Sequence, residues 1–164
     1  MRVIGCRRSA AGHAAGPTNT DFEAVTTRFD EAVREADYVC LLIPGTHENA
    51  RFLNRERLGM LRPQAWLINV ARGSVLDEAA LFDALTAGRL AGAALDVFGE
   101  EPYVPVDPAR DLRRLANVSL VPHIGSNTAA ATQRMSERAI RNVLLGEAGD
   151  IGDMDLLNPA ACRA

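Results

Sequence analysis

The stretch AWLINVARGSVLDEAALFDALTAG, residues 65–88, decides the fold. It opens with an apolar run at 65–70, which has the length of one strand, and a short turn follows. Asp77 then stands where a helix N-cap is expected, before a segment with helical periodicity at 78–87, and Gly88 marks the C-terminal stop. A strand, a turn and a capped helix in this order make up one unit of a parallel α/β sheet.

The same alternation continues on both sides of this unit. Apolar runs predict further strands at residues 2–6, 25–29, 38–43, 91–97 and 118–121. Helices are predicted at 30–36 with Asp30 near the N-cap, at 55–61 ended by Pro63, and from a Thr128 cap to about Leu145. The run at 38–43 is continuously apolar, which is typical of a strand buried on both faces. We therefore predict an α/β fold, a Rossmann-like doubly wound parallel sheet covered by helices on both faces.

Composition excludes several classes of function. The 164 residues are 48% hydrophobic and 24% charged, as in one globular domain with a real core. A net charge of -3 gives no reason to expect a nucleic-acid or membrane partner. No apolar stretch approaches the roughly 20 residues that span a bilayer, and no signal peptide is expected, so the cytoplasm is the predicted compartment. The three cysteines form no CxxC pair and no metal-ligand spacing, so we expect no metal site.

Three polar side chains follow predicted strands or the turns after them, and each has an ordinary structural explanation. Arg72 could be a surface residue that caps a helix or pairs with Asp77. Glu101 belongs to an acidic turn of a kind that is normal on a surface. His123 alone is more often structural than catalytic.

Together the three side chains favour chemistry, because parallel strands bring their carboxyl ends to one edge of the sheet, where such folds bind ligands. Arg72 can clamp a small carboxylate with two parallel hydrogen bonds. His123 can pass a proton near neutral pH, and Glu101 beside it would fix its tautomer and favour the protonated ring. This set is suited to the reduction of a 2-oxo acid.

Four ordered segments resemble one known family. They are ADYVCLLIP at 36–44, LINVARG at 67–73, LDVFGEEP at 95–102 and PHIGS at 122–126. With this spacing the chain resembles the D-isomer-specific 2-hydroxyacid dehydrogenases, and in particular their glyoxylate and hydroxypyruvate reductases, over roughly residues 1–147. The resemblance implies an oxidoreductase that transfers a hydride between NAD(P)H and a small 2-oxo acid such as glyoxylate or hydroxypyruvate.

The resemblance also implies roles for individual residues. Arg72 would bind and polarise the substrate, Glu101 would support the histidine, and His123 would be the general acid and base. The residues implied along the cofactor are Pro44, Thr46, Ala71, Gly125, Ser126 and Asp96, the last holding the nicotinamide carboxamide. Members of this family are commonly dimers through the cofactor domain, which implies a homodimer here.

The end of the first predicted strand bears on the choice of cofactor. In this fold an acid at the end of the second strand bonds the ribose 2′-hydroxyl of NAD, whereas an Arg accepts the 2′-phosphate of NADP. The first predicted strand of this chain resembles the second strand of the fold. Arg7, Arg8 and Ser9 stand at its end, and no acidic residue precedes Asp21. We therefore predict that NADP(H) is preferred over NAD(H). The alternative is that both arginines simply face solvent.

One part of the family pattern is absent. The sequence has no GxGxxG loop, and its first strand resembles the family's second, so the sheet is expected to be truncated at the N-terminus. The family's first strand lies at the centre of the sheet, and each buried backbone group left unpaired costs about 1–3 kcal/mol. We expect residues 1–149 to be a partial NAD(P)-binding domain, residues 150–164 to be a tail returning toward a substrate domain, and this chain to be inactive or poorly stable alone.

Several explanations of that expectation stay open: a start codon assigned too late, a truncated gene, or a fragment completed by another chain. Two other functions also stay open, a nicotinamide-sensing corepressor or binding module and an inactive remnant. Intact Arg72, Glu101 and His123 favour the enzyme. Turnover with a 2-oxo acid would separate an enzyme from a binding module.

Overall fold

The computed structural model describes residues 1–8 and 22–156, and the chain divides into two units, Met1–His123 and Ile124–Ala164. The strands, all in the first unit, are β1 (Ile4–Cys6), β2 (Ala24–Thr26), β3 (Tyr38–Leu41), β4 (Trp66–Asn69), β5 (Gly92–Leu95) and β6 (Val118–Leu120). The helices are α1 (Phe29–Val33), α2 (Arg55–Leu58) and α3 (Glu78–Thr86) in the first unit and α4 (Ala129–Ala148) in the second.

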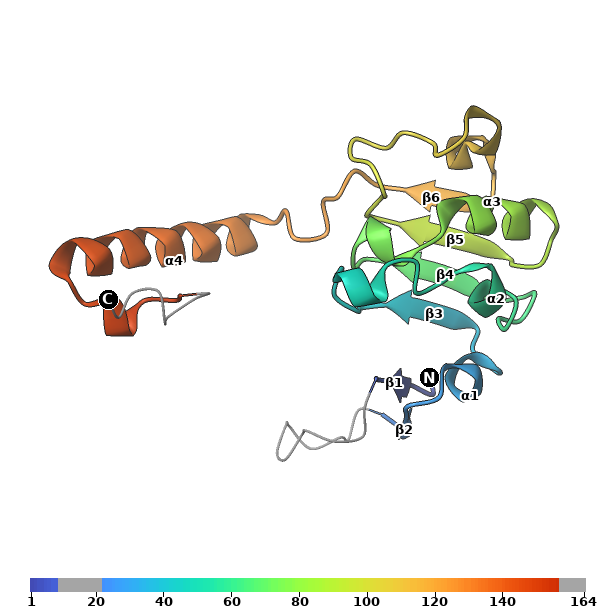
Figure 1. The fold of residues 1–164 in the computed structure, drawn as a ribbon, viewed down its shortest axis with the longest axis horizontal. Coiled ribbons are helices and arrows are strands. Elements are labelled where there is room, and N and C mark those ends of the chain that lie inside the picture. The colour runs from blue at the N-terminus through green and yellow to red at the C-terminus, as the bar shows by residue number, and fades with distance from the viewer. Residues whose placement is uncertain (9–21, 157–164) are drawn as a thin grey trace. The chain divides into compact units, whose positions relative to one another are not determined.

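The main sheet is parallel, with the strand order β3-β4-β5-β6 (Figure 1). Its register aligns Val39 with Leu67, Leu67 with Ala93, and Ala93 with Val118. Because all four strands run the same way, their carboxyl ends share one edge. The predicted Rossmann-like parallel sheet is confirmed, and a strand is present at every predicted place. Strand β2 begins one residue before its predicted start, and the other strands are shortened at one or both ends.

A second, smaller sheet pairs β1 with β2, also in parallel. Among the described residues no strand joins this pair to β3, so the two sheets are separate in Figure 1. The sequence predicts this break, because the strand that would lie between them in the doubly wound order is the family's first strand.

The hydrophobic core lies on one face of the main sheet. Val39 and Leu67 pack there with Leu58 of α2 and Leu81 of α3. The opposite face carries Tyr38, which is 66% exposed. The prediction that residues 38–43 are buried on both faces is therefore wrong within the described structure, because α2 and α3 cover the same face and leave alternate strand residues exposed.

Helix ends follow local chemistry. The Asp77 side chain accepts a hydrogen bond from the Ala80 N–H (2.9 Å), and the Thr128 hydroxyl accepts one from the Ala131 N–H (3.2 Å), so both predicted N-caps are confirmed. Gly88 follows α3 in the left-handed region (φ 65°), which glycine adopts without a steric penalty.

Several helix boundaries differ from the prediction, and α1 already ends at Val33. The N-cap of α1 is Arg28, and Asp30 lies in the first turn, where it pairs with Arg28 (2.8 Å). Helix α2 ends at Leu58, before the predicted stop. Helix α4 continues beyond Leu145 to Ala148 and ends at the left-handed Gly149 (φ 80°). In the described ranges, no helix is both long and apolar enough to cross a membrane.

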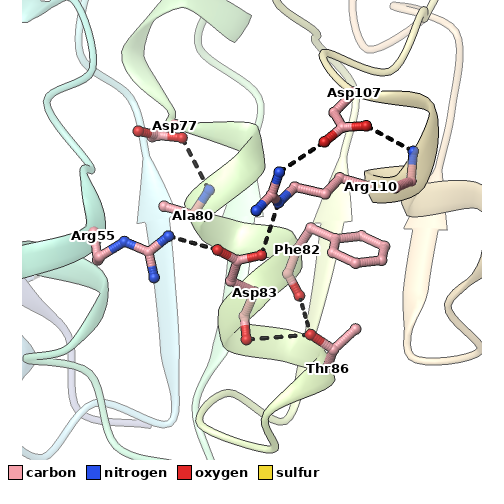
Figure 2. A network of polar contacts seen from close by, with 9 residues as sticks. Arg55, Asp77, Ala80, Phe82, Asp83, Thr86, Asp107 and Arg110 are labelled. Atoms are coloured by element: carbon pink, nitrogen blue, oxygen red, sulfur yellow. Dashed lines mark hydrogen bonds and ion pairs between the residues drawn. The ribbon is translucent and has the colours of Figure 1, made fainter.

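Helix α3 is tied to its neighbours by a network of ion pairs (Figure 2). The Asp83 carboxylate accepts hydrogen bonds from Arg55 of α2 (2.5 Å) and from Arg110 (2.9 Å). Arg110 also bonds Asp107 in the loop before β6 (2.7 Å). The network fixes the helix that directly follows the turn carrying Arg72.

Candidate active site

The turn that presents Arg72 is built by a buried amide. Asn69, the last residue of β4, has no exposed surface; its Nδ2 donates to the Arg72 carbonyl and its Oδ1 accepts from the Ala71 N–H, both at 3.1 Å. The Arg72 side chain is exposed and donates one hydrogen bond, to the Ala71 carbonyl (2.7 Å). The Asp77 carboxylate caps α3, accepting from the Ala80 N–H. Sequence reasoning missed Asn69, although its place at the end of a buried apolar strand was a usable signal.

Two glycines, Gly45 and Gly73, allow neighbouring segments to pack closely against the Arg72 turn, and sequence reasoning missed both. A Cβ atom on Gly45 would lie 2.8 Å from Cγ and 2.9 Å from Cβ of Arg72, so Gly45 packs directly against the stem of that side chain. A Cβ atom on Gly73 would lie 1.8 Å from the carbonyl carbon of Phe98 and 2.4 Å from the Gly99 nitrogen. The backbone after Arg72 therefore lies against the peptide that joins residues 98 and 99.

Glu101 and His123 form a pair. The Glu101 Oε2 lies 2.7 Å from Nδ1 of His123, and Glu101 Oε1 accepts a hydrogen bond from the Phe98 N–H (3.0 Å). His123 has a left-handed backbone (φ 51°), and its N–H donates to the Val121 carbonyl (3.0 Å) in a tight turn after β6. Both side chains stay partly exposed, at 37% for Glu101 and 43% for His123, so a ligand can reach the pair.

The surroundings of Glu101 keep it ionised. Its pKa is lowered first by the hydrogen bond with His123, then by the Phe98 N–H, with the charge of Arg72 adding to the effect. An ionised carboxylate can only accept, so Nδ1 of His123 carries a hydrogen and Nε2 is the ring atom left for proton transfer. The backbone after Arg72 lies against the peptide that follows Phe98, and the Phe98 N–H bonds Glu101, so the structure brings the Arg72 turn close to the Glu101–His123 pair.

The residues implied along the cofactor divide into two groups. Pro44, Thr46, Ala71 and Asp96 all follow the carboxyl ends of main-sheet strands. Asp96 is buried, and its N–H donates to the Asn69 carbonyl (3.0 Å). Gly125 and Ser126 belong to the second unit, so their role stays a prediction from the sequence. The described residues contain no group of three His, Cys, Asp or Glu side chains able to hold a metal ion.

The arginines after β1 differ in their contacts. The backbone N–H of Arg7 donates to Thr26 of β2 (3.1 Å), and its side chain is exposed. The Arg8 guanidinium pairs with the Glu48 carboxylate and donates to Oδ1 of the buried Asn49 (2.8 Å). Asn49 in turn donates to the Pro44 carbonyl (2.9 Å), which links Arg8 to the end of β3. The predicted Ser9 lies outside the described residues.

Comparisons with known proteins agree with this geometry. The family model of the D-isomer specific 2-hydroxyacid dehydrogenase, NAD binding domain, matches residues 1–125. The glyoxylate reductase of Pyrococcus furiosus is 39% identical over 151 residues, which are 92% of this chain and 43% of that protein. The chain spans less than half the length of the curated relatives it matches.

Two solved structures share the fold. An NADPH-dependent glyoxylate/hydroxypyruvate reductase from Sinorhizobium meliloti, in complex with NADP and malonate, matches with a TM-score of 0.75 and 33% identity over 88% of this chain and 42% of its own. A D-lactate dehydrogenase from Aquifex aeolicus, complexed with NAD and lactic acid, matches with a TM-score of 0.78 and 27% identity over 93% of this chain and 48% of its own. The parallel sheet, the strand-end residues and these matches agree: the chain belongs to the D-isomer specific 2-hydroxyacid dehydrogenase family.

Proposed function

We propose that this protein reduces a small 2-oxo acid, of the kind represented by glyoxylate and hydroxypyruvate, with a nicotinamide cofactor. The observation that carries the proposal is the 2.7 Å contact between Glu101 and His123, together with the packing of the turn after Arg72 against the peptide next to the Phe98 N–H that bonds Glu101. A fixed cation for a carboxylate and an oriented imidazole for a proton are the two groups that such a reduction needs from the protein.

Each side chain has one task in this proposal. Arg72 holds the substrate carboxylate, which orients the adjacent carbonyl group. Nε2 of His123 donates a proton to the oxygen of that carbonyl as its negative charge develops. Glu101 holds Nδ1–H, which fixes the tautomer and stabilises the charged ring. When bound, the nicotinamide supplies the hydride, and the protein supplies orientation and charge.

The donor set at the sheet edge fits a nicotinamide cofactor. We propose that Asp96 holds the carboxamide. In the same proposal Pro44, Thr46, Ala71, Gly125 and Ser126 lie along the cofactor. We propose a preference for NADP(H), since Arg7 and Arg8 follow β1 at the place where this fold meets the adenosine ribose. The ion pair between Arg8 and Glu48 competes with a 2′-phosphate, so Arg7 is the freer of the two guanidinium groups among the described residues.

The direct test is turnover by the complete protein. Oxidation of NADPH and of NADH is followed at 340 nm with glyoxylate and with hydroxypyruvate, over a range of cofactor concentrations. We expect turnover with both cofactors and a higher kcat/KM for NADPH. Cofactor binding without turnover would contradict the proposal and favour a nicotinamide-binding module.

A homodimer, a cytoplasmic location and a domain boundary at residue 149 stay predictions from the sequence.

A further inference from the structure

Glu78 is a charged side chain in an unusual position. It is the first residue of α3, yet it is only 6% exposed, and burial raises the pKa of its carboxyl group. Helix capping does not explain this, because Asp77 already caps the helix. An acidic residue at the first position of a helix can interact favourably with the helix dipole while it faces water, so burial needs a separate reason.

The reason lies in the contact that Glu78 makes. Its Oε1 accepts a hydrogen bond from the Gly99 N–H (2.7 Å), whereas Oε2 is buried with no partner among the described residues. The neighbouring N–H, that of Phe98, donates to Glu101 Oε1 (3.0 Å). Two successive backbone N–H groups thus bond two different carboxylates, one from α3 and one from the Glu101–His123 pair.

The same peptide also lies against the turn that follows Arg72. The site where Gly73 would carry a Cβ atom is 1.8 Å from the Phe98 carbonyl carbon and 2.4 Å from the Gly99 nitrogen. The peptide between residues 98 and 99 is therefore held by Glu78 and packed against Gly73. The preceding peptide, between residues 97 and 98, carries the N–H that bonds Glu101. These two consecutive peptides therefore connect the turn after Arg72 with the carboxylate of Glu101.

We infer that Glu78 is a positioning residue: by holding the Gly99 N–H it fixes the turn that presents Glu101 to His123. It thereby also fixes the position of that pair relative to Arg72. This inference rests on the proposed function of the pair. Glu78 acts through length and hydrogen bonding in this account, and its charge is secondary.

Two substitutions in the complete protein distinguish the effect of the Glu78 side-chain length from the effect of its negative charge. Glu78→Gln keeps an oxygen acceptor at the same distance and removes the charge, whereas Glu78→Asp keeps the charge and shortens the side chain by one methylene group. The matched control is Glu100→Gln, an exposed glutamate in the same turn. In each variant the carboxyl group of Glu101 is titrated by ¹³C NMR without cofactor or substrate, and kcat/KM is measured with glyoxylate.

The expected results differ between the two variants. Glu78→Asp raises the pKa of Glu101 toward its ordinary value, because the Phe98 N–H is no longer held in place, and lowers kcat/KM about 10-fold to 100-fold. Glu78→Gln and Glu100→Gln leave the Glu101 titration close to that of the unmodified protein. The Gly99 amide of the unmodified protein exchanges slowly with D₂O, and this measurement does not depend on whether any variant folds.

Three results would overturn the inference: a Glu101 titration unchanged in Glu78→Asp, a shift in Glu78→Gln as large as the shift in Glu78→Asp, or rapid exchange of the Gly99 amide. Failure of the proposed function is a different result, since it is the absence of 2-oxo acid reduction by the unmodified protein. The NMR titration and the exchange measurement need no turnover, so the two failures are distinguishable.

Discussion

The substitution Gly73→Ala perturbs the site where the structure is tightest. Ordinary van der Waals contact begins at 3.4 Å, whereas the added methyl group would lie 1.8 Å from the Phe98 carbonyl carbon, so the two backbones would have to separate by about 1.6 Å. The atoms in the way are backbone, which cannot rotate aside as a side-chain end can. Overpacking of this kind typically destabilises a fold by about 1–3 kcal/mol.

The substitution should also have a functional effect that is separate from its effect on stability. The separation moves Arg72 away from the Glu101–His123 pair, and a misplacement of about 1 Å can cost 100-fold in rate. We expect kcat/KM with glyoxylate to fall about 100-fold, measured under conditions where urea denaturation shows the variant still folded. The control is Gly152→Ala, because a Cβ atom there has open space within 4 Å and should change stability by less than about 0.5 kcal/mol. Gly73→Ala with unaltered kinetics would refute the account of how the turns are packed.

Three further predictions follow from contacts around the site. Gly45→Ala places a methyl group against the stem of Arg72, so steady-state kinetics should show a KM for the 2-oxo acid raised about tenfold; an unchanged KM would contradict this packing. Burial raises the pKa of Glu78, so the folded state binds the proton more tightly than the unfolded state. The stability that this group contributes is therefore present below the ordinary glutamate pKa. It is lost as the pH rises through the raised pKa of the folded state. Urea denaturation from pH 4 to pH 8 should show that this loss of stability with rising pH is absent in Glu78→Gln. If the loss persists in that variant, it comes from another group. Glu48→Gln frees Arg8 and should lower the KM for NADPH relative to NADH, whereas Arg8→Ala should raise it; equal effects on both cofactors would show that Arg8 does not meet the 2′-phosphate.

Local signals in the sequence predict much of the fold. The strand at 65–70, the Asp77 and Thr128 caps and the stop at Gly88 each depend on a few neighbouring residues, and the structure has them all. Asp30 lies near the N-cap of α1 as predicted, but the cap position itself is Arg28, whose side chain makes no capping hydrogen bond, so residue type alone does not fix the first residue of this helix.

The catalytic candidates could also be predicted from the sequence, whereas the long-range contacts that support them could not. Arg72 and His123 stand at strand ends in recognisable motifs, which is local information. The burial of Glu78 and the close approach at Gly73 depend on contact with residues 98 and 99, more than twenty positions away along the chain. No periodicity or composition encodes such a contact, so it became visible only in three dimensions.

The measurement that tests the central claim most directly is the rate of glyoxylate reduction by the complete protein and by its His123→Ala variant. If Nε2 of His123 donates the proton, the variant should lose about 100-fold to 10,000-fold in kcat while still binding the cofactor with unchanged affinity. A His123→Ala variant that reduces glyoxylate at the rate of the unmodified protein would contradict the account.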